Sequence, residues 1–184
     1  KLEAAGIEFL GPSAETMRRL GDKITSKLIA EAARVPVSPW SGGPVQRLEL
    51  PDLAKRIGFP VMLKATAGGG GRGIRMLREG DDLNAAFDSA QAEAANAFGD
   101  GTLFVEKTIS GARHVEVQMA ADRHGTVLAL GLRDCSVQRK HQKVVEEGPP
   151  PGLSPALVRQ LREASIRLLR EASYRGVATC EYLV

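Results

Sequence analysis

The sequence predicts an α+β fold with a mostly antiparallel sheet. Residues that favour helix N-termini stand before several segments whose apolar residues recur at helical spacing. Short apolar runs typical of strands follow one another between residues 103 and 147. Two of these runs are joined by Asp122-Arg123-His124-Gly125, a composition typical of a hairpin turn. Helices and adjacent antiparallel strands are therefore both expected.

Two helices are expected near the start of the chain. Ser13 is a good N-cap for the first, which ends at Gly21, and Asp22 caps the second. The apolar residues on one face of the second helix are Ile24, Leu28 and Ala32. Prolines and glycines between residues 36 and 44 then indicate a linker, so we expect a boundary near residue 35.

Three further helices and seven strands are predicted after residue 44. A short helix covers residues 51–57, a longer one begins after Asp81 or Asp82, and the last begins at Ser154 followed by Pro155. The apolar residues of the longer helix are Leu83, Ala86, Phe87, Ala90 and Ala94. The expected strands are residues 61–64, 74–77, 103–109, 114–120, 126–132, 143–147 and the run after Gly176.

The most informative segment is VMLKATAGGGGRGIRM, residues 61–76, in which four consecutive glycines lie between two expected strands. Glycines let a backbone approach a ligand and turn its N–H groups toward it, and Lys64 adds a positive charge, so the segment suits a polyphosphate. A dinucleotide fingerprint needs a helix after the glycines, and a P-loop needs Lys and Ser/Thr where Ile74 and Arg75 stand. A flexible hairpin that folds over phosphates remains, with a glycine-rich turn that binds nothing as the alternative.

One strand-like segment, RHVEVQ, alternates apolar and polar residues. Val115 and Val117 would face the core, whereas His114, Glu116 and Gln118 would share the other face. A single polar face on a strand is usually the solvated one, so a ligand site on this face and a plain solvated face are both open.

Two other segments have unusual charge. In RDCSVQRKHQK, residues 133–143, basic side chains cluster, and an anionic ligand would offset their repulsion; a solvated basic edge is the alternative. Glu181 interrupts an apolar run near the end of the chain. A lone acid in a strand is more often exposed, but facing a nucleotide it could hold Mg²⁺ through its carboxylate oxygens.

Composition limits the function classes. The chain has 25 basic and 22 acidic residues, a net charge of +3 and eight aromatic residues, so nucleic acid is not an expected partner. Cys135 and Cys180 form no metal or redox pattern, which favours a reducing compartment, the cytoplasm, with the mitochondrial matrix left open. No apolar run approaches the ~18 residues of a membrane span. Both ends interrupt expected elements, so we expect a fragment.

In their order along the chain these motifs resemble the biotin carboxylase family, which has the ATP-grasp fold. The segments that carry the resemblance are GPSAETMRRLGDK, KATAGGGGRGIR, EK, RHVEVQ, RDCSVQRKHQKVVEE and CEYL. The likeness covers essentially the whole chain, and RDCSVQRKHQKVVEE is its most specific part. It implies a partial ATP-grasp fold, with residues 1–35 as a helical connection from a preceding domain, 36–108 as the lid subdomain and 109–184 as the first part of the C-terminal subdomain.

The resemblance also implies roles for individual residues. Those that match nucleotide-binding positions are Lys23 and Lys64 at the phosphates, Gly68, Gly69, Gly70, Gly71 and Gly73 in the loop above them, Glu106, Lys107 and Ile109 at the adenine, His114, Gln138 and His141 at the ribose and phosphates, and Leu183. Lys143 matches a catalytic lysine near bicarbonate and biotin, and Glu181 matches the first of two glutamates that hold Mg²⁺ or Mn²⁺. The second glutamate would lie beyond Val184, so residues 1–184 are expected to be inactive alone.

The implied reaction has two steps. ATP phosphorylates bicarbonate to carboxyphosphate, and the carboxyl group then passes to biotin on a carrier domain. The implied partners are the biotin carboxyl carrier domain and the carboxyltransferase of an acyl-CoA carboxylase, and the full protein is expected to be a homo-oligomer. Two alternatives stay open: another ATP-grasp ligase, such as the carbamoyl-phosphate synthetase large chain, and a non-catalytic fragment that binds ATP or serves assembly.

Overall fold

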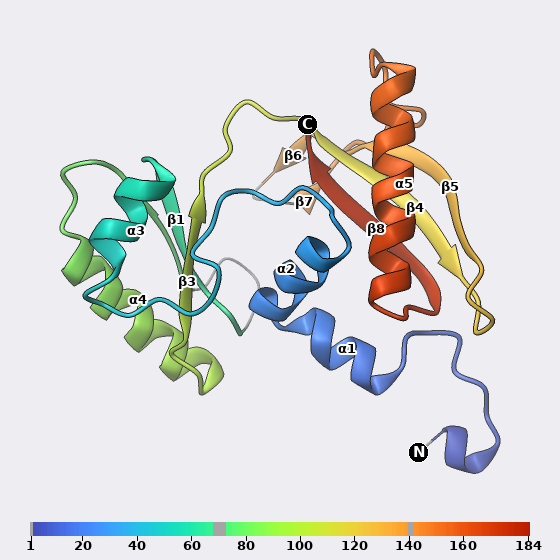
Figure 1. The fold of residues 1–184 in the computed structure, drawn as a ribbon, viewed down its shortest axis with the longest axis horizontal. Helices are drawn as coiled ribbons and strands as arrows, with labels where there is room; N and C mark the ends of the chain where they lie inside the picture. The colour runs from blue at the N-terminus through green and yellow to red at the C-terminus, as the bar shows by residue number, and fades with distance from the viewer. Residues whose placement is uncertain (1, 68–72, 140–141) are drawn as a thin grey trace. The chain divides into compact units, whose positions relative to one another are not determined.

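The computed structural model describes residues 2–67, 73–139 and 142–184. Every strand pairing in these ranges is antiparallel, as predicted. The chain divides into two compact units, which can be followed along the colour bar of Figure 1. Unit 1 contains Lys1–Arg19, Ile29–Val35 and Gly111–Val184, and unit 2 contains Leu20–Leu28 and Pro36–Ser110. Within the described ranges, no helix has the length and apolar character needed to cross a membrane.

Unit 2 is built on a three-stranded sheet. Its central strand is β1 (Val61–Ala65), which pairs with β2 (Ile74–Leu77) on one side and β3 (Leu103–Lys107) on the other. The partner of Lys64 in β2 is Ile74, so the two strands that flank the glycine run are neighbours, as predicted. The third strand ends at Lys107 rather than at residue 109.

Two helices pack on this sheet. α3 (Leu50–Ile57) contacts β3, and α4 (Leu83–Phe98) contacts β1 and β2. Of the two predicted caps of α4, the structure selects Asp82, whose carboxylate accepts the Ala85 N–H at 3.0 Å, and Gly99 closes the helix with a φ of 73°. The fully buried core residues of this unit include Leu50, Ala54, Val61, Leu63, Ala90, Ala94 and Val105.

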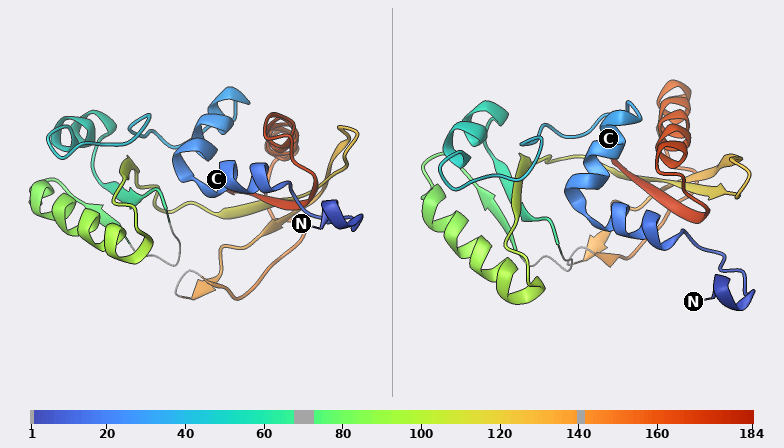
Figure 2. Two further views of the ribbon diagram at one scale, coloured as in Figure 1. Left: turned by 90° about the horizontal axis from the view of Figure 1, so that it is seen from below. Right: turned by 60° about the horizontal axis from the view of Figure 1, so that its bottom comes forward.

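Unit 1 contains a second three-stranded sheet. β4 (His114–Ala121) lies between β5 (Val127–Asp134) and β8 (Gly176–Leu183), and α5 (Pro155–Glu171) lies across one face of the sheet (Figures 1 and 2). α5 begins where predicted, since the Ser154 hydroxyl accepts the N–H of Leu157. The core residues between the helix and the sheet include Val115, Val117, Met119, Leu161 and Leu169. Side chains alternate along a strand, so the other face of β4 presents His114 and Glu116.

Three helical segments come first in the chain: η1 (Glu3–Ala5), α1 (Ala14–Gly21) and α2 (Lys23–Ala32). Ser13 caps α1 by accepting the N–H of Thr16 at 3.1 Å, and Asp22 caps α2 by accepting the N–H of Thr25 at 2.7 Å. Both predicted N-caps are therefore confirmed.

The predicted apolar face of α2 is wrong. The buried side chains of the helix are Ile29 and Ala30, whereas Leu28 is 46% exposed. The chain at the end of α2 is held by Arg167 of α5, whose guanidinium donates to the Ala33 carbonyl at 3.0 Å. This contact, between residues 134 positions apart, helps to orient the end of the helix. The spacing of apolar residues within α2 cannot predict it.

The strand predicted over residues 143–147 is also wrong. A short pair, β6 (Gln138–Arg139) and β7 (Gln142–Lys143), ends at residue 143, and the next N–H groups donate to the Val137 carbonyl. Glu147 alone pairs with β5, through an isolated bridge to Asp134. Prolines follow from residue 149 onward, and they lack the N–H that would extend the pairing.

Candidate functional site

Both lysines predicted to contact phosphates lie in unit 2, at the end of β1. Lys64 belongs to this strand, and the Lys23 ammonium donates to the carbonyl of Ala65 at 2.8 Å. Burial, the largest cause, and the nearby charge of Lys64 lower the pKa of Lys23. An anionic ligand would reverse this effect, so the pair suits a phosphate.

Glu106 on β3 accepts hydrogen bonds from two lysines rather than facing solvent. Its side chain is 12% exposed, with Oε1 in contact with Lys64 and Oε2 2.7 Å from the Nζ of Lys27. Burial is the largest influence on Glu106 and acts to raise its pKa, but the hydrogen bonds from the two lysines outweigh it and hold the pKa below its usual value. The side chain thus acts as an internal counter-ion, which leaves only the backbone of Glu106 for the predicted contact with adenine.

The side chain of Lys107 has a structural role in the described part of the chain. Its ammonium donates to the carbonyls of Gly58 at 2.7 Å and Phe59 at 2.8 Å, just after α3. Ile109, the third residue predicted at the adenine, follows the end of β3 and is 44% exposed.

Lys107→Met is expected to lower the free energy of unfolding by about 1–3 kcal/mol, because two carbonyls lose a charged donor. Thermal unfolding of the full-length protein measures the change, and Lys55→Met on the exposed side of α3 is the matched control. An unfolding midpoint equal to that of the control would contradict this role.

One glycine of the predicted phosphate loop is described. Gly73 has a φ of 65°, and a Cβ there would lie 2.9 Å from the Cβ of Ala65. Its N–H donates to Glu93 of α4 at 3.1 Å. Local packing therefore requires glycine at this position whether or not a ligand binds. Gly68, Gly69, Gly70 and Gly71 lie outside the described residues.

The face of the unit 1 sheet that α5 does not cover, called the open face below, carries a compact charged cluster. Glu116 is 1% exposed, and its carboxylate contacts the Lys143 ammonium and the Arg133 guanidinium, the latter at 3.0 Å. Glu181 stands opposite Glu116 in the β4–β8 register, and its Oε1 lies 2.9 Å from the same ammonium. Lys143 is thus held between a buried carboxylate and a half-exposed one.

His114 adds a directed donor to this cluster. The Gln138 amide donates to His114 Nδ1 at 2.9 Å and to the Cys135 carbonyl at 2.9 Å, which leaves the ring proton of a neutral imidazole on Nε2. That nitrogen is buried, lies 3.5 Å from Glu181 and 3.6 Å from Glu116, and makes no hydrogen bond within the described ranges. Its hydrogen-bonding capacity is therefore not used by the described residues.

Leu183 and His141 are the remaining predicted site residues of this unit. Leu183 pairs with His114 in the β4–β8 register and is 60% exposed. His141 lies outside the described residues.

One metal-binding arrangement is present in the described part of the chain. His114, Glu116 and Glu181 each offer a ligand atom, and these atoms lie within 4.8 Å of one another. Mg²⁺ prefers oxygen ligands, which disfavours His114, and Glu116 is already neutralised by Arg133 and Lys143. Glu181, with its side chain 53% exposed, is the carboxylate that fits such an ion.

Three residues of these clusters were not predicted as site residues. Glu116 and Arg133 hold the charged cluster of unit 1, and Lys27 holds Glu106 in unit 2. The alternation of RHVEVQ did place Glu116 on the face of His114, and a buried carboxylate there would have been the natural partner for the basic run at residues 133–143. Nothing local in the sequence points to Lys27.

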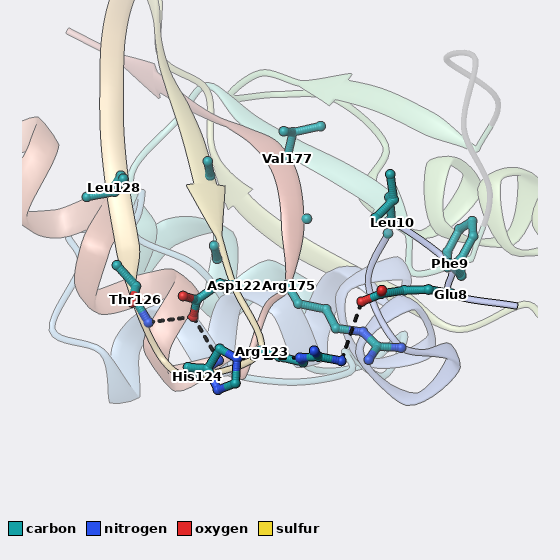
Figure 3. A pocket seen from close by; sticks show the side chains of 14 residues that line it. Glu8, Phe9, Leu10, Asp122, Arg123, His124, Thr126, Leu128, Arg175 and Val177 are labelled. Carbon is teal, nitrogen blue, oxygen red and sulfur yellow. Dashed lines mark hydrogen bonds and ion pairs between the residues drawn. The ribbon is translucent and has the colours of Figure 1, made fainter. Parts of the chain in front are cut away.

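A separate hollow of about 510 Å³ lies at the other end of the unit 1 sheet (Figure 3). Arg123 pairs with Glu8 at 3.7 Å, and the Asp122 carboxylate accepts the N–H groups of His124 and Thr126 within the hairpin turn. None of the predicted site residues lines it. The hydrogen bonds of Asp122 stabilise the hairpin turn itself and do not point to a ligand.

Comparison with known proteins places the chain in a family. Residues 22–184 match the model of the carbamoyl-phosphate synthase L chain, ATP binding domain. The chain is 45% identical over 181 residues to biotin carboxylase from Halalkalibacterium halodurans, covering 98% of this chain and 40% of that protein. It is 44% identical over 180 residues to pyruvate carboxylase from Staphylococcus aureus, covering 97% of this chain and 16% of that protein.

Comparison with solved structures also finds biotin carboxylases. A biotin carboxylase–β-γ-ATP complex from Campylobacter jejuni matches with a TM-score of 0.92 and 44% identity, covering all of this chain and 41% of that one. The biotin carboxylase domain of Hydrogenobacter thermophilus 2-oxoglutarate carboxylase, with MgADP, ADP and bicarbonate, matches with a TM-score of 0.90 and 40% identity, covering 99% and 40%. The chain therefore spans about two fifths of the length of the biotin carboxylases that it matches. It has the fold of the biotin carboxylase ATP-grasp structures, and it belongs to the family of the carbamoyl-phosphate synthase L chain ATP-binding domain.

Proposed function

We propose that the chain is the ATP-binding part of a biotin carboxylase, which uses ATP and bicarbonate to carboxylate biotin on a carrier protein. The observation that carries the proposal is the cluster of Lys143, Glu116, Glu181 and His114 on the open face of a sheet. The 44% identity to a biotin carboxylase–ATP complex supports it. The Hydrogenobacter domain, solved with MgADP and bicarbonate, supports the same choice of ligands.

In this proposal the lysines at the end of β1 bind the ATP phosphates. Lys23 and Lys64 supply two ammonium groups within one unit, and such charges neutralise a phosphoryl group during transfer. The resemblance implies that the glycine run adds backbone N–H donors to the phosphates.

The cluster in unit 1 positions the second reactant. Mg²⁺ bound with ATP would supply charge neutralisation at the transferred phosphate, with Glu181 as its ligand from this chain. When Glu181 serves the ion, Lys143 keeps Glu116 as its partner and has N–H donors to spare for bicarbonate. The Nε2–H of His114 donates to a ligand oxygen beside them.

Within this function we propose an acyl-CoA carboxylase as the parent, with a biotin carboxyl carrier domain and a carboxyltransferase as partners and a homo-oligomeric assembly. The Staphylococcus pyruvate carboxylase has nearly the same identity as the biotin carboxylase, so the final acceptor needs a direct test. The full-length protein with its partners should transfer carboxyl groups to acetyl-CoA or propionyl-CoA. Transfer to pyruvate alone would contradict the acyl-CoA assignment.

ADP release by the full-length protein tests the first step. Release should depend on both bicarbonate and biotin, and ammonia should not replace biotin. Release that depends on ammonia would favour a carbamoyl-phosphate synthetase instead. Binding of ATP without any turnover would favour a non-catalytic role.

Residues 1–184 alone are expected to show no turnover. The chain spans about two fifths of the matched biotin carboxylases, and Glu181 by itself supplies too few oxygen ligands for Mg²⁺, which is usually octahedral. A coupled ADP assay with bicarbonate and free biotin checks this. A rate within about tenfold of the full-length protein would show that the prediction is wrong.

A further inference from the structure

Lys27 forms an ion pair with Glu106 in unit 2, and the roles proposed above do not explain this contact. It lies one turn after Lys23 on α2, and its side chain is 17% exposed. Its Nζ lies 2.7 Å from Oε2 of Glu106 and donates to the Ser38 hydroxyl at 3.2 Å. Oε1 of the same carboxylate contacts Lys64. One carboxylate therefore joins a largely buried lysine to a lysine that we assign to the phosphates.

Aromatic packing fixes Lys27 in this position. Its ammonium lies 5.5 Å from the ring centroid of Trp40, within the range of a cation–π contact. Trp40 packs edge-on against Phe104, with centroids 6.2 Å apart, and Phe104 is 1% exposed. Ser38 also donates to Glu106, at 3.2 Å. Lys27 is thus held against Glu106 from several directions.

The ion pair between Lys27 and Glu106 affects how strongly Glu106 holds the Lys64 ammonium. A carboxylate and an ammonium in contact attract each other, and more strongly where they are partly withdrawn from water. If Glu106 were paired with Lys64 alone, its full negative charge would compete with a phosphate for that ammonium and would also repel the phosphate. With Lys27 bound at Oε2, the charge of Glu106 is already neutralised.

We propose that Lys27 is a positioning residue, which neutralises Glu106 so that Lys64 remains available to the phosphates of a bound nucleotide. The inference rests on the proposed function only in taking that nucleotide to be ATP. Lys27 itself does not contact the nucleotide in this account.

ATP binding to the full-length protein, measured by calorimetry without bicarbonate, tests the proposal. Lys27→Met should weaken binding about tenfold, equivalent to about 1.4 kcal/mol. Lys27→Arg, which keeps the charge, should bind within about threefold of the unchanged protein, as should the control Lys55→Met.

The decisive variant removes both charges. In Glu106→Gln combined with Lys27→Met, no uncompensated carboxylate competes for Lys64, so ATP affinity should return to within about threefold of the unchanged protein. A double variant as weak as Lys27→Met would overturn the proposal, because Lys27 would then bind the nucleotide itself or support the fold. If Lys27→Met fails to fold, Glu106→Gln alone still decides, since it should bind ATP at least as tightly as the unchanged protein.

These results are separable from the proposed function. Absence of biotin-dependent ADP release by the unchanged protein would contradict biotin carboxylation and leave the affinity comparison intact. Biotin-dependent release together with unchanged ATP affinity in Lys27→Met would contradict the role of Lys27 alone.

Discussion

Lys143→Met in the full-length protein is expected to lower kcat for biotin carboxylation by about 10²–10³-fold, the cost of removing one preorganised charged donor. The Lys143 ammonium lies between Glu116 and Glu181, on the face where we place bicarbonate and the metal ion. ATP binding should change by less than about tenfold, since we assign the phosphates to lysines of unit 2.

Gln142→Met is the matched control for Lys143→Met. Gln142 precedes Lys143 on β7, is exposed, and points to the opposite face because side chains alternate along a strand. Steady-state ADP release measures both variants. Turnover of Lys143→Met within about threefold of the control would exclude a catalytic role for Lys143.

Glu116→Gln is expected to have the largest effect on stability. Glu116 is 1% exposed and contacts two cations, and breaking a buried ion pair by removing one partner typically costs about 3–5 kcal/mol. Thermal unfolding of the full-length protein should show a lower midpoint. Adding Arg133→Met should recover part of the loss, because the second variant removes one of the two cations that lose Glu116 as a partner.

Glu146→Gln is the control for this experiment. Glu146 also pairs with Arg133, at 3.2 Å, but its side chain is 48% exposed, so its removal should cost about 0–1 kcal/mol. An equal loss of stability in Glu116→Gln and Glu146→Gln would show that burial does not determine how much Glu116 contributes to stability.

Local signals predicted most of the elements. The capping side chains of Ser13, Asp22 and Ser154 each accept the expected backbone N–H group, because a cap depends on residues only three apart. The hairpin turn at residues 122–125 likewise joins β4 and β5. The failures at α2 and at residues 143–147 arose where a distant contact, or a proline-rich segment beside an edge strand, decided the outcome.

The charged cluster of unit 1 shows why site geometry is harder to predict. Counting outward from the hairpin pairs Ala121 with Val127 and would place Glu116 opposite Leu132. A register shift between Gln118 and Met119 instead brings Arg133 opposite Glu116. One extra residue in β5 therefore determines whether the buried carboxylate has a guanidinium partner, and the sequence does not show where that residue is inserted.

The cluster in unit 2 depends on contacts between distant segments. Lys27, Ser38, Lys64 and Glu106 come from a helix, a linker and two strands, and their interactions span up to 79 positions along the chain, from 27 to 106. The motif that contains Lys64 indicated a phosphate site. It contained no information about the carboxylate that shares this lysine.

Formation of carboxybiotin tests the central claim most directly. Full-length protein incubated with ATP, Mg²⁺, labelled bicarbonate and biotinylated carrier should transfer label to biotin, in an amount that matches the ADP released. The label should be nearly absent in Lys143→Met and unchanged in Gln142→Met. ADP release without any label on biotin would contradict the account.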